Sequence, residues 1–336
     1  MSRLSTITLA AAFLAAVLLA APASTSYAAD PAVIRIGYFQ SPNGELLAKG
    51  RGLLAARFPD SKIEYIKFDV GRDVNAAFAG GSLDIGTIGT PPGTAGLVNE
   101  LPYKIYYLHD IIGESEALVV KSSSGINAIE DVKGKTIATP FGSTSHFSFL
   151  QALKQNDIDY KEVRILDITG QDVLAAWTRG DIDGAYIWQP AQQKLIDDGG
   201  KVVVTSLQVA QNGGITGEFG LVGDKFYAEH PEVVRAYIEI LDQATKEYKA
   251  AGDETVGILA SELGLSPEET RSVISQIVVL DAAEQKDPRY LGTKANPGAL
   301  AALLKQTADF LLAEKAIKTS PPESFFPDKI LVELYE

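Results

Sequence analysis

A short run of hydroxyl residues offers the clearest chemistry in this sequence. Gly142 is followed by Ser143, Thr144 and Ser145, between an apolar segment, KTIATP, and a helix-like segment, HFSFLQALKQN. A turn into a helix leaves backbone N–H groups without partners, and the helix dipole places partial positive charge behind them. Together with the hydroxyls, these N–H groups could hold an anion without any lysine or arginine. The alternative is that the hydroxyls only cap the helix.

The composition narrows the classes of protein to consider. The chain has 336 residues, of which 46% are hydrophobic and 22% charged, and these values predict a soluble globular protein of roughly two domains. Its formal net charge of −13 disfavours binding to nucleic acid or to anionic lipid. A bound anion would therefore have to be held by local dipoles rather than by a basic surface.

Two scarce residue types exclude several kinds of chemistry. The sequence contains no cysteine, which excludes disulfides, thiol catalysis and cysteine-zinc sites. The three histidines, His109, His146 and His230, do not have a spacing typical of metal ligands. We therefore expect neither a metal nor any other cofactor.

Residues 1–28 have the features of a secretory signal peptide. Arg3 precedes a run of alanine, leucine and valine, and small residues follow, ending in Ser26-Tyr27-Ala28. This pattern predicts cleavage after Ala28, which removes Arg3 and changes the net charge from −13 to −14. A retained membrane anchor is the alternative, but the apolar run is short for a span. No other segment is suitably long and apolar, so we expect an exported protein without membrane insertion.

From residue 33 onward, segments typical of strands alternate with segments typical of helices. The expected strands cover residues 33–39, 62–68, 84–89, 104–110, 117–121, 135–140, 163–168, 185–188, 201–206 and 219–223. The expected helices cover residues 45–58, 73–81, 91–100, 172–180 and 191–198, and another begins at residue 143. After residue 223 the pattern is almost entirely helical. Such alternation predicts the α/β class, with helices on both faces of the sheets.

The sequence contains an internal repeat. Residues 71–91 read GRDVNAAFAGGSLDIGTIGTP and residues 170–190 read GQDVLAAWTRGDIDGAYIWQP, with nine of the 21 positions identical at a constant offset of 99. Chance similarity between two helix–turn–strand units is the alternative, but the ungapped register favours two similar lobes. Two such lobes suggest a cleft between them.

The expected strand ends show which residues should line this cleft, because ligands of open α/β sheets bind beyond the carboxyl ends of strands. Four segments lie at such ends: residues 38–41, Gly89-Thr90, the turn 142–145 and Trp188-Gln189. In the first of these, Tyr38 and Phe39 must point to opposite sides of the strand. We expect Phe39 to form a wall of the cleft.

Several segments resemble a known family. They are SEALVVK (115–121), GKTIATPFGSTSHFSFLQALK (134–154), LAAWTRGDIDGAYIWQPA (174–191), DGGKVV (198–203), EHPEVVRAY (229–237) and QTADFL (306–311). The chain resembles the periplasmic substrate-binding proteins of bacterial ABC importers in the nitrate/sulfonate/taurine group, and most of all their taurine-binding members. The similarity covers most of the chain after the signal peptide, and the combination of PFxSTSHxSxL with GDIDGAYxWxPA is its most specific feature.

This resemblance implies a bilobed α/β fold of the periplasmic-binding-protein type II kind, which closes on its ligand by a hinge. By analogy, residues 30–115 and 222–336 form lobe 1, and residues 116–221 form lobe 2. Hinge segments are expected to cross between the lobes around 116–120 and 218–222. The implied function is periplasmic binding of taurine for import, with a membrane permease and its cytoplasmic ATPase as partners.

The resemblance also assigns roles at the sulfonate end of taurine. Ser143, Thr144 and Ser145 are expected to supply N–H and O–H donors from one lobe. Gln40 and Thr90 are expected to add donors from the other lobe.

At the ammonium end, two residues are the main candidates. Trp188 offers a ring face, and such a cation–π contact is worth about 0.5–2 kcal/mol; Glu218 offers a carboxylate. Phe39, Glu116 and His146 are weaker candidates for ligand contact. The alternatives are core packing for Trp188, a solvated edge charge for Glu218, a structural ion pair for Glu116 and a supporting role for His146.

Two departures from the taurine-binding pattern leave the ligand open. Glu218 stands where those proteins have an aspartate, and Thr90-Pro91 stands where they tend to have two small hydroxyl residues. Another aliphatic or amino sulfonate, or a small anion such as nitrate, is therefore an alternative ligand.

A secreted enzyme on the same fold and a receptor-docking sensor are alternatives of another class. Ser145 and His146 are neighbours on the expected helix, so their side chains point about 100° apart and are poorly placed as nucleophile and base. We therefore expect a binding protein rather than an enzyme.

Overall fold

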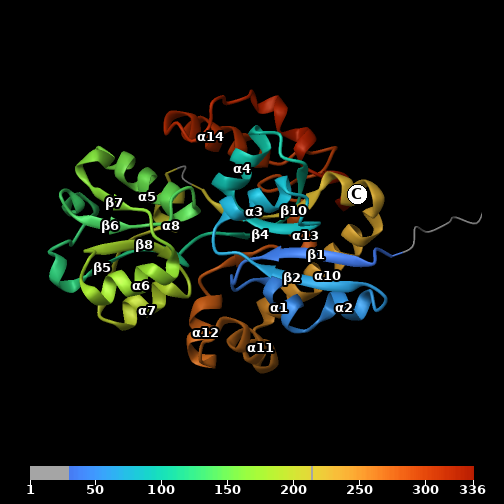
Figure 1. Cartoon of the computed structure of the whole chain (residues 1–336), viewed down its shortest axis with the longest axis horizontal. Coiled ribbons are helices and arrows are strands. Elements are labelled where there is room, and N and C mark those ends of the chain that lie inside the picture. The colour runs from blue at the N-terminus through green and yellow to red at the C-terminus, as the bar shows by residue number, and fades with distance from the viewer. Residues whose placement is uncertain (1–29, 213–214) are drawn as a thin grey trace, which may run out of the picture.

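The computed structural model describes residues 30–212 and 215–336, and the predicted signal peptide at 1–28 lies outside the described residues. The chain forms two mixed β-sheets with their helices, side by side along the long axis of the molecule (Figure 1). The predicted α/β class is confirmed. Within the two described ranges, no helix has the length and apolar character needed to cross a membrane.

The first sheet has six strands in the order β11-β4-β10-β3-β1-β2. Their bounds are Val33–Tyr38 (β1), Lys62–Lys67 (β2), Ile85–Gly89 (β3), Tyr103–Ile111 (β4), Gly217–Gly223 (β10) and Val278–Val279 (β11). Strand β1 pairs in parallel with β2 and β3, whereas β10 runs antiparallel to β3 and β4. The carboxyl ends of β1, β3 and β4 and the start of β10 therefore lie at one edge of this sheet.

The helices around the first sheet come from both ends of the chain. They are Gly44–Gly50 (α1), Leu53–Arg57 (α2), Gly71–Ala79 (α3), Thr90–Val98 (α4), Asp224–Glu229 (α9), Pro231–Ala250 (α10), Asp253–Leu263 (α11), Pro267–Ile274 (α12), Ala282–Gln285 (α13) and Leu300–Ala313 (α14). One apolar core joins these helices to the sheet, and it includes Ile36, Leu47, Phe219, Tyr237 and Leu304. The C-terminal helices thus pack with β1 in one folded unit. We call the first sheet with these helices the first body.

One prediction for this part is corrected. The single helix predicted over residues 45–58 is broken, because Arg51 and Gly52 separate α1 from α2. Gly52 has φ +65°, a left-handed conformation that glycine adopts without a side-chain clash. The C-terminal part is mainly helical as predicted, with the two-residue strand β11 pairing with β4.

The second sheet has five strands in the order β7-β6-β8-β5-β9. Its strands are Glu116–Lys121 (β5), Thr136–Ala138 (β6), Arg164–Leu166 (β7), Gly184–Trp188 (β8) and Gly200–Thr205 (β9). Its helices are Thr144–Gln155 (α5), Gly170–Arg179 (α6), Ala191–Asp197 (α7) and Ser206–Ala210 (α8). Phe149 of α5 and Val209 of α8 pack with the core on one face, and Val173 of α6 and Leu195 of α7 with the core on the other. The second sheet is therefore the middle of three layers. We call this sheet with its four helices the second body.

The internal repeat corresponds to one structural unit in each sheet. The first copy forms α3 and β3, and the second forms α6 and β8. Asp84 precedes β3, and its carboxylate accepts a hydrogen bond from Arg35 N in β1 at 2.8 Å. Asp183 precedes β8, and its carboxylate accepts a hydrogen bond from Thr136 N in β6, also at 2.8 Å. Two repeat positions with the same residue thus make the same link to a neighbouring parallel strand.

The chain passes from one sheet to the other twice. It leaves the first sheet after β4 and enters the second at β5, and it leaves α8 and re-enters the first sheet at β10. The segments expected as hinges, 116–120 and 218–222, are therefore parts of β5 and β10, and the crossings precede them. The proposed boundary between residues 221 and 222 falls inside β10.

Candidate functional site

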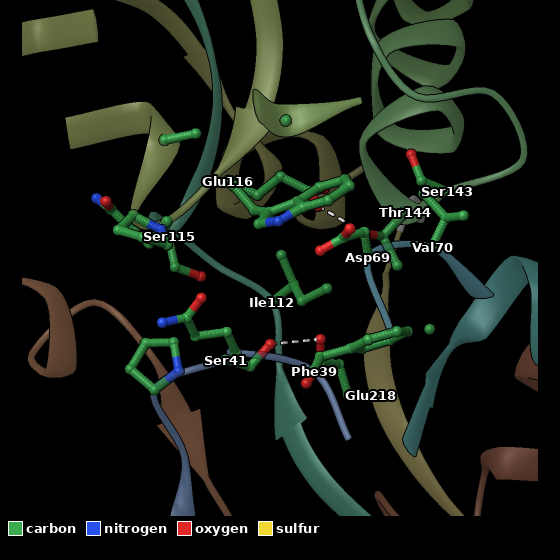
Figure 2. A pocket seen from close by; sticks show the side chains of 18 of the residues that line it. Phe39, Ser41, Asp69, Val70, Ile112, Ser115, Glu116, Ser143, Thr144 and Glu218 are labelled. Carbon is green, nitrogen blue, oxygen red and sulfur yellow. Dashed lines mark hydrogen bonds between the residues drawn. The ribbon is translucent and has the colours of Figure 1, made fainter. Parts of the chain in front are cut away.

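A cavity of about 230 Å³ lies between the facing edges of the two sheets. The first sheet and its connections contribute Phe39, Ser41 and Glu218, and the second contributes Thr144 and Trp188. In Figure 2, Ser143 and Thr144 appear at the upper right and Ser41 and Glu218 below, with Ile112 between them. Pockets for drug-sized ligands measure roughly 300–1,000 Å³, so this cavity suits a smaller molecule.

Glu116 occupies the first position of β5, opposite Trp188 in the antiparallel register with β8. The residue is only 1% exposed, yet it also lines the cavity. Thr144 Oγ1 donates a hydrogen bond to one carboxylate oxygen at 2.6 Å, and Ser206 Oγ donates to the other at 2.9 Å. Burial raises the pKa of Glu116, and these hydroxyl donors oppose the rise. Glu116 is therefore held by hydroxyls rather than by the ion pair considered from sequence.

The hydroxyl turn caps α5 and packs beside the cavity. Ser143 Oγ accepts a hydrogen bond from His146 N and donates one to Pro140 O at 2.6 Å. Thr144 Oγ1 gives its hydrogen to Glu116, so neither hydroxyl retains a hydrogen for a ligand. Ser145 is fully buried and is absent from the cavity wall. In this arrangement the turn can offer an anion its backbone N–H groups but not its hydroxyl hydrogens.

Glu218 lies at the opposite side of the cavity, at the second position of β10. Its carboxylate accepts hydrogen bonds from Ser41 Oγ at 2.9 Å and from Asn43 Nδ2 at 3.3 Å. Asp110, near the end of β4, faces Glu218 in the antiparallel register and lines the same cavity. Burial and the neighbouring charge of Asp110 raise the pKa of Glu218 well above its usual value. This end of the cavity is strongly attractive to a cation.

Three helices begin at the cavity and turn their N-termini towards it. The lining includes Gly71 at the start of α3, Thr144 at the start of α5 and Gly170 at the start of α6. The first N–H groups of a helix carry partial positive charge and donate to no intrahelical acceptor. Lys67 and Lys194 also line the cavity. This part of the cavity therefore suits an anionic group.

Two further predicted site residues, Thr90 and Gln40, have other hydrogen-bond partners. Thr90 is fully buried, is absent from the cavity wall, and exchanges two hydrogen bonds of 2.9 Å with the backbone of Gly217. Gln40 lines the cavity, but its amide donates to Glu262 O and accepts from Lys67.

His146 does not line the cavity, and its ring contacts residues of the hydroxyl turn. Its ring stacks on Phe141 with centroids 4.5 Å apart, and its Nδ1 accepts from Gly142 N at 3.3 Å. Burial lowers the pKa of His146 to about 4, while the nearby Asp167 opposes this shift. The ring is therefore neutral near pH 7 and supports the turn without adding charge.

The comparison with known proteins agrees with this architecture. Residues 62–255 match the family model described as NMT1/THI5 like. The chain belongs to the NMT1/THI5-like family. Over 236 residues, or 70% of this chain and 72% of its relative, it is 37% identical to the taurine-binding periplasmic protein of Escherichia coli (strain K12). The family recognised from the sequence motifs is thereby confirmed.

Solved structures show how widely members with this fold differ in function. The alkanesulfonate-binding protein SsuA from Xanthomonas axonopodis pv. citri bound to MOPS matches with a TM-score of 0.75 and 23% identity, covering 90% of this chain and 99% of that one. The desulfurization enzyme DSZB matches with a TM-score of 0.63 and 16% identity, covering 91% and 98%. These likenesses show the bilobed fold, which serves binding proteins and an enzyme alike.

Several cavity residues were missed by sequence reasoning. Asp110 ends a predicted strand, so the strand-end rule that selected Trp188 could have selected it too. Lys67 also lies at a strand end, so the same rule could have selected it. Lys194 lies inside α7, where the strand-end rule does not apply. Asn43 lies outside the cavity wall and caps α1 by accepting from Glu45 N and Leu46 N, while its amide donates to the carboxylates of Asp110 and Glu218.

A second buried polar cluster lies behind the site. Thr87 Oγ1 donates to Glu45 and contacts His109 Nε2 at 3.2 Å, and Tyr237 Oη donates to Glu45 Oε1 at 3.1 Å. Because Thr87 gives its hydrogen to Glu45, His109 Nε2 must be the donor to Thr87. Among the described residues, no group of His, Asp and Glu side chains is arranged to hold a metal ion. The cluster links β3, β4, α1 and α10 inside the first body.

Proposed function

We propose that this chain is the periplasmic substrate-binding component of an ABC importer for taurine or a similarly short amino sulfonate. The observation that carries the proposal is the opposed polarity of one small cavity. Buried carboxylates, Asp110 and Glu218, lie at one side, and the N-termini of α3, α5 and α6 converge at another. A zwitterion with its charges separated by two carbons fits this polarity.

The two ends of the ligand have different partners in this proposal. Backbone N–H groups at residues 71, 144 and 170, assisted by Lys67 and Lys194, hold the sulfonate. Glu218 and Asp110 accept hydrogen bonds from the ammonium, and Trp188 and Phe39 form apolar walls. The revised sulfonate site relies on helix N-termini, because the Ser143 and Thr144 hydroxyls already donate elsewhere.

The relatives support the transport role. The 37% identity to a taurine-binding periplasmic protein extends over 70% of the chain. We propose that residues 1–28 direct export, and that a membrane permease and its cytoplasmic ATPase receive the loaded protein. The closed lobes would present one surface to the permease.

Calorimetric titration of the ligand-free protein tests the proposed ligand. Taurine should bind more tightly than ethanesulfonate, which lacks the ammonium, and more tightly than nitrate or sulfate. Equal affinity for taurine and ethanesulfonate would remove the ammonium-binding roles given to Glu218 and Asp110. A preference for nitrate would favour the small-anion alternative.

The substitution Glu218→Gln separates recognition of the two ligand ends. Hydrogen bonds to charged groups contribute about 1.5–3 kcal/mol, so taurine should bind roughly 10- to 100-fold more weakly. Ethanesulfonate should lose much less, because it has no group at this end. If both ligands weaken alike, Glu218 has a structural role only.

A further inference from the structure

Asp110 and Glu218 form a pair of carboxyl groups at one wall of the cavity. They are opposite residues of β4 and β10 in the antiparallel register. A single amide group, Asn43 Nδ2, lies 3.4 Å from Asp110 Oδ2 and 3.3 Å from Glu218 Oε2. Both carboxyl groups also line the same cavity. Two carboxyl groups held around one amide disfavour each other's ionised form.

The surroundings of this pair add negative rather than positive charge. Glu116 of β5 and Glu45 of α1 both act on it electrostatically, and the Tyr248 hydroxyl of α10 lies near Asp110. Ser41 and Asn43, between β1 and α1, are neutral donors. Across the part of the chain that the structure describes, no lysine, arginine or histidine forms an ion pair with Asp110 or Glu218.

The charged residues on the cavity wall do not change this excess of negative charge around Asp110 and Glu218. Asp69 is negative, and Lys67 directs its ammonium to the side-chain oxygen of Gln40 at 2.7 Å. Lys194, on α7 of the other body, is exposed. Burial raises the pKa of Asp110 to about 7, with the Asn43 hydrogen bond opposing the rise. Two adjacent carboxyl groups without a cation do not both ionise readily.

We propose that Asp110 and Glu218 together bind the ligand's ammonium group. In the ligand-free protein this pair of carboxyl groups holds one proton, which the ammonium displaces into solvent on binding. This inference rests on the proposed function. No covalent bond of the ligand changes: the carboxyl O–H bond breaks, its proton passes to water, and ammonium N–H groups donate to the two carboxylates. Asp110 thus becomes a specificity-determining residue beside Glu218.

The exchange has a defined dependence on pH. As long as the empty pair holds its proton, each bound ligand must release one proton, so affinity should rise about tenfold per pH unit. At a pH where the empty pair has already lost its proton, affinity should level off. Ethanesulfonate has no ammonium to replace the proton, so its affinity should not rise with pH in this way.

Calorimetry of the full-length mature protein in buffers with different ionisation enthalpies counts the released protons directly. At about pH 6, taurine should release close to one proton and ethanesulfonate close to none. Taurine that binds with no proton release and with the same affinity from about pH 5.5 to about pH 8 would overturn the inference while leaving the proposed function intact. Failure of taurine to bind at any of these pH values would instead overturn the proposed function.

The substitution Asp110→Asn tests the assignment to this pair. The variant should release no proton with taurine and should lose the rise in affinity with pH. Asp60→Asn is the matched control, because Asp60 is exposed between α2 and β2 and away from the cavity wall; it should behave as wild type. Undiminished proton release in Asp110→Asn would assign the proton elsewhere and reject the inference. If Asp110→Asn does not fold, the number of protons that the wild-type protein releases on binding taurine still tests the inference.

Discussion

Arg72 Nη1 lies 3.4 Å from Asp167 Oδ2, and this contact joins α3 of the first body to the loop after β7 of the second. Asp167 also accepts a hydrogen bond from Phe141 N at 2.8 Å through its other oxygen. The ion pair therefore links the helix start at Gly71 to the turn that leads into α5. It bridges the two bodies next to Gly71, which lines the cavity.

Replacing Arg72 by glutamine should shorten the lifetime of the ligand complex. Exposed ion pairs contribute about 0.2–1 kcal/mol, so dissociation of taurine should become no more than about fivefold faster. Stopped-flow tryptophan fluorescence can follow this step, because Trp188 lines the cavity. Arg179→Gln is the control, since its ion pair with Asp181 lies within the second body. Equal dissociation rates for Arg72→Gln and wild type would show that the contact does not hold the closed form.

Gly89 should be a sensitive position for closure. A Cβ atom at this residue would lie 2.8 Å from Thr144 Cγ2, across the boundary between the two bodies. Gly89→Ala should therefore obstruct their approach, and overpacking of this kind costs about 1–3 kcal/mol. We expect taurine affinity, measured by calorimetry, to fall roughly 5- to 150-fold, with little change in the stability of the ligand-free protein.

Gly257→Ala provides the control for this glycine substitution. Gly257 lies in α11, and no atom approaches within 4 Å of a Cβ placed there. Its taurine affinity should equal that of wild type. If Gly89→Ala also retains full affinity, the two bodies need not approach this closely around the ligand.

The Thr144 hydroxyl should contribute to folding stability more than to ligand binding. Thr144→Val removes a hydrogen-bond donor from the buried Glu116 carboxylate, and an unsatisfied buried partner costs about 1–3 kcal/mol. Urea unfolding should show this loss, and Ser206→Ala, which removes the other donor outside the cavity wall, should show a similar one. Loss of sulfonate binding without loss of stability would restore the role expected from sequence, in which the hydroxyl donates to the ligand.

Strand-end reasoning located part of the cavity wall from the sequence. Glu116, Trp188 and Glu218 were selected at strand ends or by family resemblance, and all three line the cavity. This reasoning succeeds because β–α alternation forces the parallel strands of one sheet to end at the same edge. The repeat was equally informative, since Asp84 and Asp183 make matching hydrogen bonds in the two sheets.

The directions of individual hydrogen bonds could not be predicted in this way. Thr90 is bonded to Gly217, a residue 127 positions away that reaches it only because β10 inserts between β3 and β4. The hydrogens of Ser143 and Thr144 likewise go to Pro140 and Glu116, and only the three-dimensional pairing decides this. The local sequence pattern predicts at which end of a sheet a side chain lies. Its hydrogen-bond partners depend on how the folded chain brings other segments to it.

His109 should make the protein less stable in mild acid. Burial lowers the pKa of His109 to about 3, whereas an unfolded chain titrates near about 6.5. Between these values the unfolded state binds a proton that the folded state does not. The contribution of His109 to stability is therefore fully present above about pH 6.5 and is lost as the pH falls towards 3.

The matched substitutions His109→Gln and Glu45→Gln isolate this effect, because the two residues should respond with opposite sign. Between about pH 7 and about pH 5, the free energy of unfolding of wild type relative to His109→Gln should fall by about 2 kcal/mol. Burial raises the pKa of Glu45 to about 7, so the folded state binds the extra proton and wild type should lose stability relative to Glu45→Gln as the pH rises through this range. Urea unfolding at both pH values measures the two differences. If the wild-type and His109→Gln curves stay parallel, His109 carries its proton equally in both states and the neutral buried ring assigned here is wrong.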